Sequence, residues 1–245
     1  MKKFVPLFII ILIFNGCKKN EKDPVTVPVQ FTSTTYATLG TYDSDGRPNY
    51  LLTPVVISSS MKSFINSSLI EKSDLRATHP ELLSTTAIAD IKITQASDVF
   101  ITFVSQITTS SNALAFYTYP TNTPPASSKD ITTITYFFPS AGTGTKLVAG
   151  DNVKIGSFAA GTSIGFVLLK NAWNTTTKTL DNNVVHFCSN DVLNPEVNPD
   201  LKKHAVLINY TAESKVLIGF ENTDRTVATC DHDFNDIVIY ATVTP

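Results

Sequence analysis

Residues 87–106 read AIADIKITQASDVFITFVSQ, and this stretch carries the two β-strand signals from which we predict the fold. Residues 87–94 alternate apolar and polar side chains, which is typical of a strand with one face in the core and the other in water. Residues 98–106 have apolar side chains on both faces, which is typical of a strand at the centre of a sheet. The stretch therefore predicts a half-exposed strand followed by a central one.

Further β-rich runs, separated by turn residues, occupy most of the remaining chain. Parallel sheets need crossover helices, and almost no helical pattern lies between these runs. About ten strands arranged in this way favour an all-β, antiparallel β-sandwich of the jelly-roll type, with a closed barrel as the alternative. The other predicted strands are residues 113–119, 131–138, 152–158, 163–170, 184–188, 204–209, 215–220 and 236–243.

A short helical segment is expected before the strands, over residues 58–84. Met61, Ile65 and Leu69 recur at helical spacing, and the serines at 58–60 can cap a helix start. Pro80 is suited to the first position of a second helical turn. We therefore expect a helical segment packed on the sandwich.

Length and composition indicate a folded core. The chain has 245 residues, of which 42% are hydrophobic and 16% are charged. Internal repeats of fixed period are absent from the sequence, which argues against propellers and solenoids. We predict a single β-sandwich domain over residues 31–245. The formal net charge of −2 does not suggest a nucleic-acid partner.

The N-terminus resembles a bacterial lipoprotein signal peptide over residues 1–16. Lys2 and Lys3 precede an apolar run, residues 4–14, that is too short to span a bilayer. A small residue before Cys17 resembles a lipobox, which implies lipidation of Cys17, with cleavage without lipidation as the alternative. Residues 17–30 read as an extended tether, and their charges resemble surface-export signals of Bacteroidota lipoproteins.

Near the C-terminus, residues 230–240 read CDHDFNDIVIY and combine acidic residues with a β-strand. On an extended backbone Asp231, Asp233 and Asn235 would converge on one side while Phe234 turns inward, and Asp236 would add another oxygen. Carboxylates this close repel one another unless a cation or backbone N–H groups compensate them. An all-oxygen set with flexible spacing suits Ca²⁺.

Additional oxygen ligands for this ion are expected from two neighbouring loops. Glu221 ends the preceding strand, and a hairpin would bring it near the 231–236 loop. Asn194 and Glu196 lie in a second oxygen-rich loop. The alternative for these loops is a set of Asx turns with no ion.

Two cysteines, Cys188 and Cys230, each lie beside one of the oxygen-rich loops. In an exported protein they could form a disulfide. A Cys₂His₂ zinc site that also uses His186 and His232, or two free thiols, are the alternatives.

The sequence contains none of the catalytic motifs that would indicate an enzyme, neither G-x-S-x-G nor H-E-x-x-H nor a phosphate-binding glycine loop. We therefore predict a non-enzymatic protein. The alternatives are a carbohydrate-active hydrolase that uses Glu221 and Asp233 as acid and base, and a purely structural envelope component.

Several segments together resemble LruC-type bacterial lipoproteins, a family that contains a domain of unknown function (4114). The resemblance extends over residues 36–243, with a family core at 85–243, and its most specific part is DHDFND at 231–236. Two positions depart from the family, in which an acid often replaces Asn222 and an aromatic residue often replaces Cys188. The matching segments are residues 42–51, 98–104, 114–120, 161–166, 193–196, 219–221 and 231–236.

This resemblance implies an exported protein more than it implies an activity. The family occurs in surface proteins, including large adhesins. We therefore expect a calcium-stabilised protein of the cell outer membrane, lipid-anchored and surface-exposed, that serves adhesion or binds a glycan or protein ligand.

Overall fold

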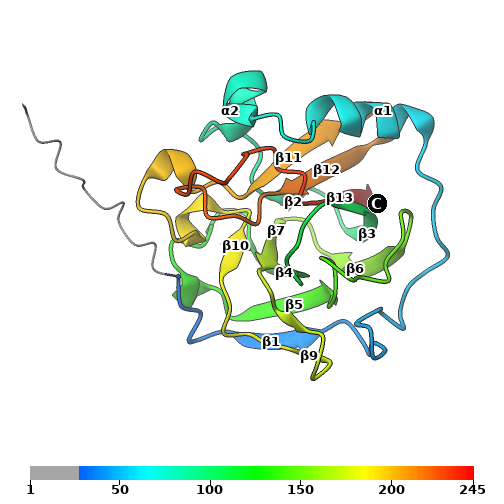
Figure 1. The fold of residues 1–245 in the computed structure, drawn as a ribbon. Coiled ribbons are helices and arrows are strands. Elements are labelled where there is room, and N and C mark those ends of the chain that lie inside the picture. Colours follow the sequence, from blue (N-terminus) through cyan, green and yellow to red (C-terminus); the bar gives the residue numbers. More distant parts are fainter. Residues whose placement is uncertain (1–27) are drawn as a thin grey trace, which may run out of the picture.

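The computed structural model describes residues 28–245 and contains two main β-sheets (Figure 1). In the first sheet, β7 pairs with β4 along one edge and shares its other edge between β2 and β10. The β1–β5 pair is parallel, and the other pairs of this sheet are antiparallel. Its strands are β1 (Thr35–Thr38), β5 (Thr133–Phe138), β4 (Ala113–Pro120), β7 (Thr162–Leu169), β10 (His186–Cys188) and β2 (Ile91–Ile93).

The second sheet has five strands in the order β11-β12-β13-β3-β6, and all neighbours are antiparallel. Separate hydrogen-bonded sheets confirm the sandwich and exclude the closed-barrel alternative for the described residues. The strands are β11 (Ala205–Tyr210), β12 (Lys215–Phe220), β13 (Ile237–Thr244), β3 (Ser97–Gln106) and β6 (Asn152–Phe158).

The main core lies between the two sheets. Strand β3 contributes Val99, Ile101 and Phe103 to it, because side chains two residues apart on a strand point to the same face. Phe166 of β7 and Ile239 of β13 belong to the same cluster and are fully buried. The central position predicted for residues 98–106 is therefore confirmed.

A helical layer covers the outer face of the second sheet, above β11 and β12 in Figure 1. Ser58 caps the first helix by accepting a hydrogen bond from the Met61 N–H at 3.0 Å. Met61 and Leu69 pack with Val238 and Tyr240 of β13. The expected helical segment is confirmed as α1 (Ser59–Ser68), α2 (Leu75–Thr78) and the 3₁₀ turn η1, Pro80–Leu83.

The outer face of the first sheet carries a separate hydrophobic cluster. Phe31, from the segment before β1, packs there with Ala115, Val167 and Leu193. The remaining elements are short and lie in the connections between strands. They are β8 (Trp173–Asn174), β9 (Thr179–Leu180), η2 (Ser128–Asp130), η3 (Asp191–Leu193), η4 (Pro199–Leu201) and η5 (Thr211–Glu213).

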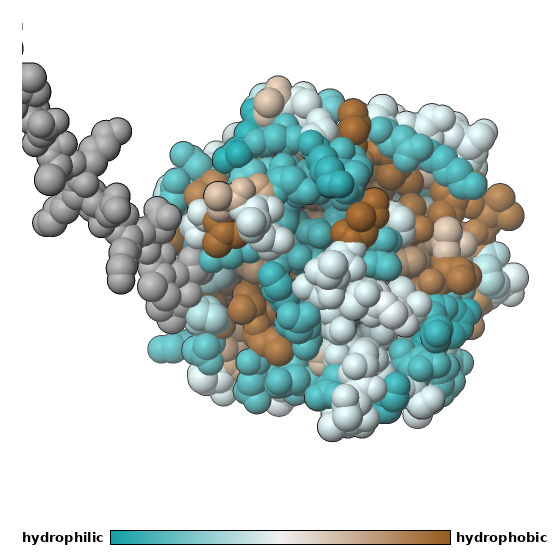
Figure 2. Space-filling view, in the orientation of Figure 1, coloured by the Kyte–Doolittle hydropathy of each residue, from teal (hydrophilic) through white to brown (hydrophobic). Residues whose placement is uncertain are grey.

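The N-terminal predictions, including the lipidation of Cys17, lie outside the described residues. Among residues 28–245, the structure contains no helix that is long and apolar enough to cross a membrane. The space-filling view shows hydrophobic side chains in scattered groups on a largely hydrophilic face (Figure 2). Val56, which is 91% exposed, precedes α1.

Candidate cation site

The hairpin register brings two carboxyl groups together at the start of β13. Antiparallel pairing of β12 with β13 ends with Phe220 opposite Ile237. The next residues outward, Glu221 and Asp236, therefore face each other across the hairpin. Asp236 Oδ2 also accepts a hydrogen bond from the Asn222 N–H at 2.7 Å. The sequence prediction that a hairpin brings Glu221 near the acidic loop is confirmed.

The loop before β13 is not extended, contrary to the sequence prediction. His232 and Phe234 have left-handed backbone conformations, with φ of 59° and 58°, so strand alternation does not set the side-chain directions. Phe234 is fully buried below α1, as predicted, and the Arg225 guanidinium lies 5.1 Å from its ring centre. This aromatic anchor fixes the loop on the second sheet.

The same loop is tied to the connection between α1 and α2. The Leu75 N–H donates to the His232 carbonyl oxygen at 3.0 Å. Asp233 Oδ2 accepts from the Lys72 N–H at 2.7 Å, and its Oδ1 accepts from the Asn235 N–H at 3.2 Å. Asp233 thus joins the helical layer to the acidic loop.

Three carboxylates converge at this point. Glu221, Asp231 and Asp233 each offer one oxygen, and these oxygens lie within 4.8 Å of one another. Glu221 is 1% exposed and Asp233 is 2% exposed, whereas Asp231 is open to solvent. The cluster therefore combines two buried acids with one that is accessible from outside.

Glu221 is only partly compensated by the protein. Its Oε1 accepts a hydrogen bond from the Thr223 N–H at 2.9 Å. Its Oε2 is buried and accepts from no N–H group of the described residues. The Asp236 carboxyl and the Cys230 thiol lie beside Glu221 and can donate to it only while they are protonated. A buried acceptor without a partner costs about 1–3 kcal/mol, and more when it is charged. Glu221 Oε2 is therefore a position where a bound cation would remove a specific penalty.

Burial raises the pKa values of the carboxyl groups at this site. Burial, followed by the charge of Glu221, raises the pKa of Asp236 to about 8. Burial also raises the pKa of Glu221, and it raises the pKa of Asp233 to about 6 against the two N–H donors. Without a cation, the cluster holds protons that it would release on metal binding.

The predicted ligands Asn194 and Glu196 lie outside this group. Asn194 Oδ1 accepts from the Cys188 N–H at 2.6 Å, and its Nδ2 donates to the Cys188 and Lys202 carbonyl oxygens. Glu196 Oε1 lies 2.7 Å from His204 Nε2, and its Oε2 is buried without a partner among the described residues. Both side chains hold the second loop in place, and Glu196 does not belong to the group of converging carboxylates. The structure therefore gives no support to these two residues as ligands of the same ion.

Asn235 also differs from the prediction. It lines a cavity of about 250 Å³ beside α1, together with Ile65 and Leu69. Asn235 contacts Asp233 through its backbone N–H, which donates to Asp233 Oδ1, and not through its side-chain oxygen. The left-handed Phe234 that precedes it explains why the expected alternation does not continue to this residue.

Sequence reasoning missed a buried cation next to the acids. Arg225 is 2% exposed, and its Nε donates to His232 Nδ1 at 3.1 Å. Its Nη1 donates to the Lys203 carbonyl oxygen at 3.0 Å. Its position within the acidic stretch 221–225 is the one sequence signal that could have indicated this role. Arg225 therefore ties His232 of the acidic loop to the backbone of Lys203.

The predicted disulfide is wrong, because Cys188 and Cys230 are both free thiols. Cys188 is buried in the cluster on the outer face of the first sheet. Cys230 lies in the loop before β13, with its Sγ 3.4 Å from His232 Nδ1. The zinc alternative fails too, because His186 is hydrogen-bonded to Tyr36 and Val184.

Comparison with known families places this hairpin in a defined segment. Residues 158–244 match the family model of a domain of unknown function, DUF4114. The DUF4114 segment runs from the end of β6 to the end of β13 and contains every carboxylate of the site. Neither the curated proteins nor the solved structures give a match. The DUF4114 assignment of this segment is supported, while the LruC type and the bacterial group stay predictions.

Proposed function

We propose that this protein is an exported, lipid-anchored β-sandwich of the bacterial cell envelope whose C-terminal hairpin is stabilised by Ca²⁺. Glu221, Asp231 and Asp233 are the proposed ligands, with Asp236 opposite Glu221. The observation that carries the proposal is Glu221 Oε2, a buried carboxylate oxygen that accepts from no N–H group of the described residues and lies in a cluster of three acids.

The chemistry of the donor set favours Ca²⁺ over other common cations. All three groups are carboxylates, and oxygen ligands in irregular arrangements suit Ca²⁺. Zn²⁺ would favour nitrogen or sulfur ligands. Mg²⁺ demands near-ideal octahedral geometry and gives up water reluctantly. Solvent and backbone carbonyls would supply the remaining oxygens at the exposed Asp231 side.

An ion at this position would hold three parts of the fold together. Glu221 directly follows β12, and Asp231 belongs to the loop before β13. Asp233 is bonded to the backbone of Lys72 between α1 and α2. We therefore assign the ion a structural role, with adhesion or ligand binding as the function of the stabilised domain.

Calcium titration of the purified chain tests the site. We expect Ca²⁺ to raise the melting temperature of the wild type and to have no such effect on Glu221→Gln, since a ligand that binds only the folded state stabilises it. Glu81→Gln, in an exposed 3₁₀ turn, is the matched control and should keep the shift. The absence of a shift at millimolar Ca²⁺ would overturn the proposal.

The lipid anchor has a separate test. Metabolic labelling with an alkyne fatty acid should label the wild-type protein and not Cys17→Ala. Protease treatment of intact cells then distinguishes an external from a periplasmic position. An unlabelled wild-type protein would leave simple secretion as the explanation.

The raised pKa of Asp236 favours a second candidate function. In this function, two paired carboxyl groups would hydrolyse a glycosidic bond. A carboxyl with a pKa of about 8 can act as a general acid at neutral pH. Against this function, Glu221 is 1% exposed, which leaves little room for a sugar to reach it. Release of reducing sugar that disappears in Glu221→Gln would favour the enzyme over the structural ion.

A further inference from the structure

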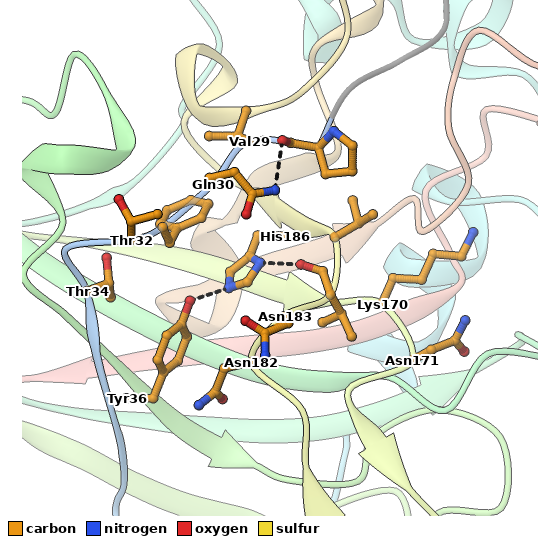
Figure 3. Close-up of a pocket in the computed structure, with 14 residues that line it drawn as sticks. Val29, Gln30, Thr32, Thr34, Tyr36, Lys170, Asn171, Asn182, Asn183 and His186 are labelled. Atoms are coloured by element: carbon orange, nitrogen blue, oxygen red, sulfur yellow. Dashed lines mark hydrogen bonds between the residues drawn. The ribbon is translucent and has the colours of Figure 1, made fainter.

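A second feature lies far from the acids, in a polar pocket of about 640 Å³ at the edge of the first sheet. Its walls come from the segment before and within β1, from the end of β7 and from the turn that leads into β10. Figure 3 shows Tyr36, Asn182 and Asn183 close to His186, with Lys170 and Asn171 at the far side of the pocket and the Lys170 ammonium directed away from the ring. Pockets of about 300–1,000 Å³ are typical of small-ligand sites.

The hydrogen bonds of His186 define what Tyr36 can offer to a ligand. His186 Nδ1 lies 2.8 Å from the Val184 carbonyl oxygen, which can only accept, so Nδ1 carries the proton. Burial lowers the pKa of His186 to about 4, so the ring is neutral at neutral pH. Nε2 is then an acceptor, and the Tyr36 hydroxyl donates to it at 2.8 Å. The free lone pair of Tyr36 Oη can accept from a ligand hydroxyl.

The side-chain amides of Asn182 and Asn171 offer hydrogen-bond donors to a ligand, whereas Tyr36 offers an acceptor. Asn182 Oδ1 accepts from the Tyr136 hydroxyl at 2.7 Å, and Asn171 Oδ1 accepts from the Ser111 N–H at 3.0 Å. These bonds use the oxygen of each amide and leave both Nδ2 groups as donors. Asn183 has no side-chain partner within residues 28–245, so its amide is available in full. The pocket therefore presents one fixed acceptor and several donors.

The charge of the pocket has one sign. Among the described residues, Lys170 is the only cationic one that lines the pocket, because His186 is neutral, and no acidic side chain lines it. Within the described part of the chain, the Lys170 ammonium makes no ion pair. Lys170 can therefore pair with an anionic group of a ligand, and a carboxylate would also accept from the neighbouring Asn171 amide.

We propose that this pocket binds an acidic saccharide, whose hydroxyls contact Tyr36, Asn182 and Asn183 and whose carboxylate pairs with Lys170. Sugars fit this lining because each hydroxyl both donates and accepts a hydrogen bond. Val184 supplies apolar surface at the pocket wall, whereas Phe31 is buried and stacks on the His186 ring at a centroid distance of 4.5 Å. The inference deepens the ligand-binding role proposed above and does not depend on the bound Ca²⁺.

The test is a glycan array with the purified full chain, followed by calorimetry with the best acidic oligosaccharide and its neutral counterpart of equal length. We expect Tyr36→Phe and Asn183→Ala each to weaken binding about tenfold, the loss of one ligand hydrogen bond. Lys170→Gln should remove the preference for the acidic sugar and the salt dependence of binding. Lys62→Gln on α1, outside the pocket, is the matched control and should bind as the wild type.

Tyr36→Phe leaves His186 Nε2 without a donor and could therefore weaken binding by disturbing the fold. Asn183→Ala avoids this problem, because the Asn183 side chain is exposed and has no partner among the described residues. Failure to bind any acidic glycan would overturn the proposal, as would equal binding of neutral sugars or full binding by all three pocket variants. The Ca²⁺-dependent melting shift is recorded on the same samples. A protein that keeps that shift but binds no glycan refutes the pocket alone, and the reverse result refutes the cation site alone.

Discussion

Glu221 lies opposite Asp236, one position beyond the last residue pair of the β12–β13 ladder, Phe220 with Ile237. Burial raises the pKa of both carboxyl groups, and the charge of Glu221 raises the pKa of Asp236 further, while a hydrogen bond from Asp236 partly offsets the effect of burial on Glu221. At neutral pH this end of the hairpin therefore retains a proton or takes up a cation. Proton uptake and Ca²⁺ binding are two ways to relieve the same repulsion.

Asp233→Ala should destabilise the protein even without Ca²⁺. The substitution removes the acceptor of the Lys72 and Asn235 N–H groups, which costs about 1–3 kcal/mol. Urea unfolding in the presence of a chelator measures this loss. Glu221→Gln, which replaces a repelled carboxylate by a neutral amide, should be as stable as the wild type or more stable under the same conditions. Equal destabilisation by both substitutions would contradict these separate roles.

Phe234→Ala should cost about 3–5 kcal/mol, because it leaves a cavity in the cluster below α1. It should also weaken Ca²⁺ binding, since the ring anchors the loop that carries Asp231 and Asp233. Chemical denaturation and calcium titration measure the two effects. Phe234→Leu, which retains an apolar anchor, should show smaller changes in both. Unchanged calcium affinity in a folded Phe234→Ala protein would contradict the anchoring role.

The two described cysteines should react as free thiols. In denaturant without reductant, alkylation followed by mass spectrometry should modify both Cys188 and Cys230. In the folded protein Cys188 should react slowly, because it is fully buried. A peptide pair linked through the two residues would contradict the structure. The double variant Cys188→Ala, Cys230→Ala should retain the Ca²⁺-dependent melting shift.

His186 should make stability fall as the pH decreases. Its folded-state pKa of about 4 lies below the ordinary value of 6.5. Between these values the unfolded chain binds a proton that the folded state does not bind. The stabilisation present above pH 6.5 is thus lost progressively towards pH 4, by up to about 3 kcal/mol.

Other groups also titrate between pH 4 and pH 7. The measurement therefore compares the free energies of unfolding of two proteins. The free energy of unfolding of the wild type minus that of His186→Gln should decrease from pH 7 to pH 4, and groups shared by both proteins cancel. A difference that does not change with pH would show that His186 is not held neutral by its burial.

The spacing of apolar residues predicted the long strands and the capped helix. This was possible because the buried residues of each of these elements lie close together in the sequence. Strand β1, Thr35–Thr38, was missed. Three of its four residues are polar or small, and it forms only by pairing with β5, about a hundred residues later. β8 and β9, two residues each, are too short to show a period.

The site was predictable only in part, for a similar reason. A hairpin between two recognisable strands leads to Glu221 beside the 231–236 loop. Asn194 and Glu196 have equally suitable oxygens, yet contacts with Cys188 and His204 use Asn194 Oδ1 and Glu196 Oε1 and hold both residues in the second loop. The pocket around His186 combines the N-terminal segment with turns from the middle of the chain, and no spacing in the sequence connects these parts.

The position of β1 also has a mechanical consequence. If the chain is tethered at its N-terminus, any pull on the domain enters through Phe31 and a four-residue edge strand held by a single neighbour, β5. The acidic hairpin belongs to the other sheet, where β13 lies between β12 and β3. Under a pulling force, β1 would detach first and lengthen the tether. The His186 pocket would therefore open before the force reached the carboxylate cluster.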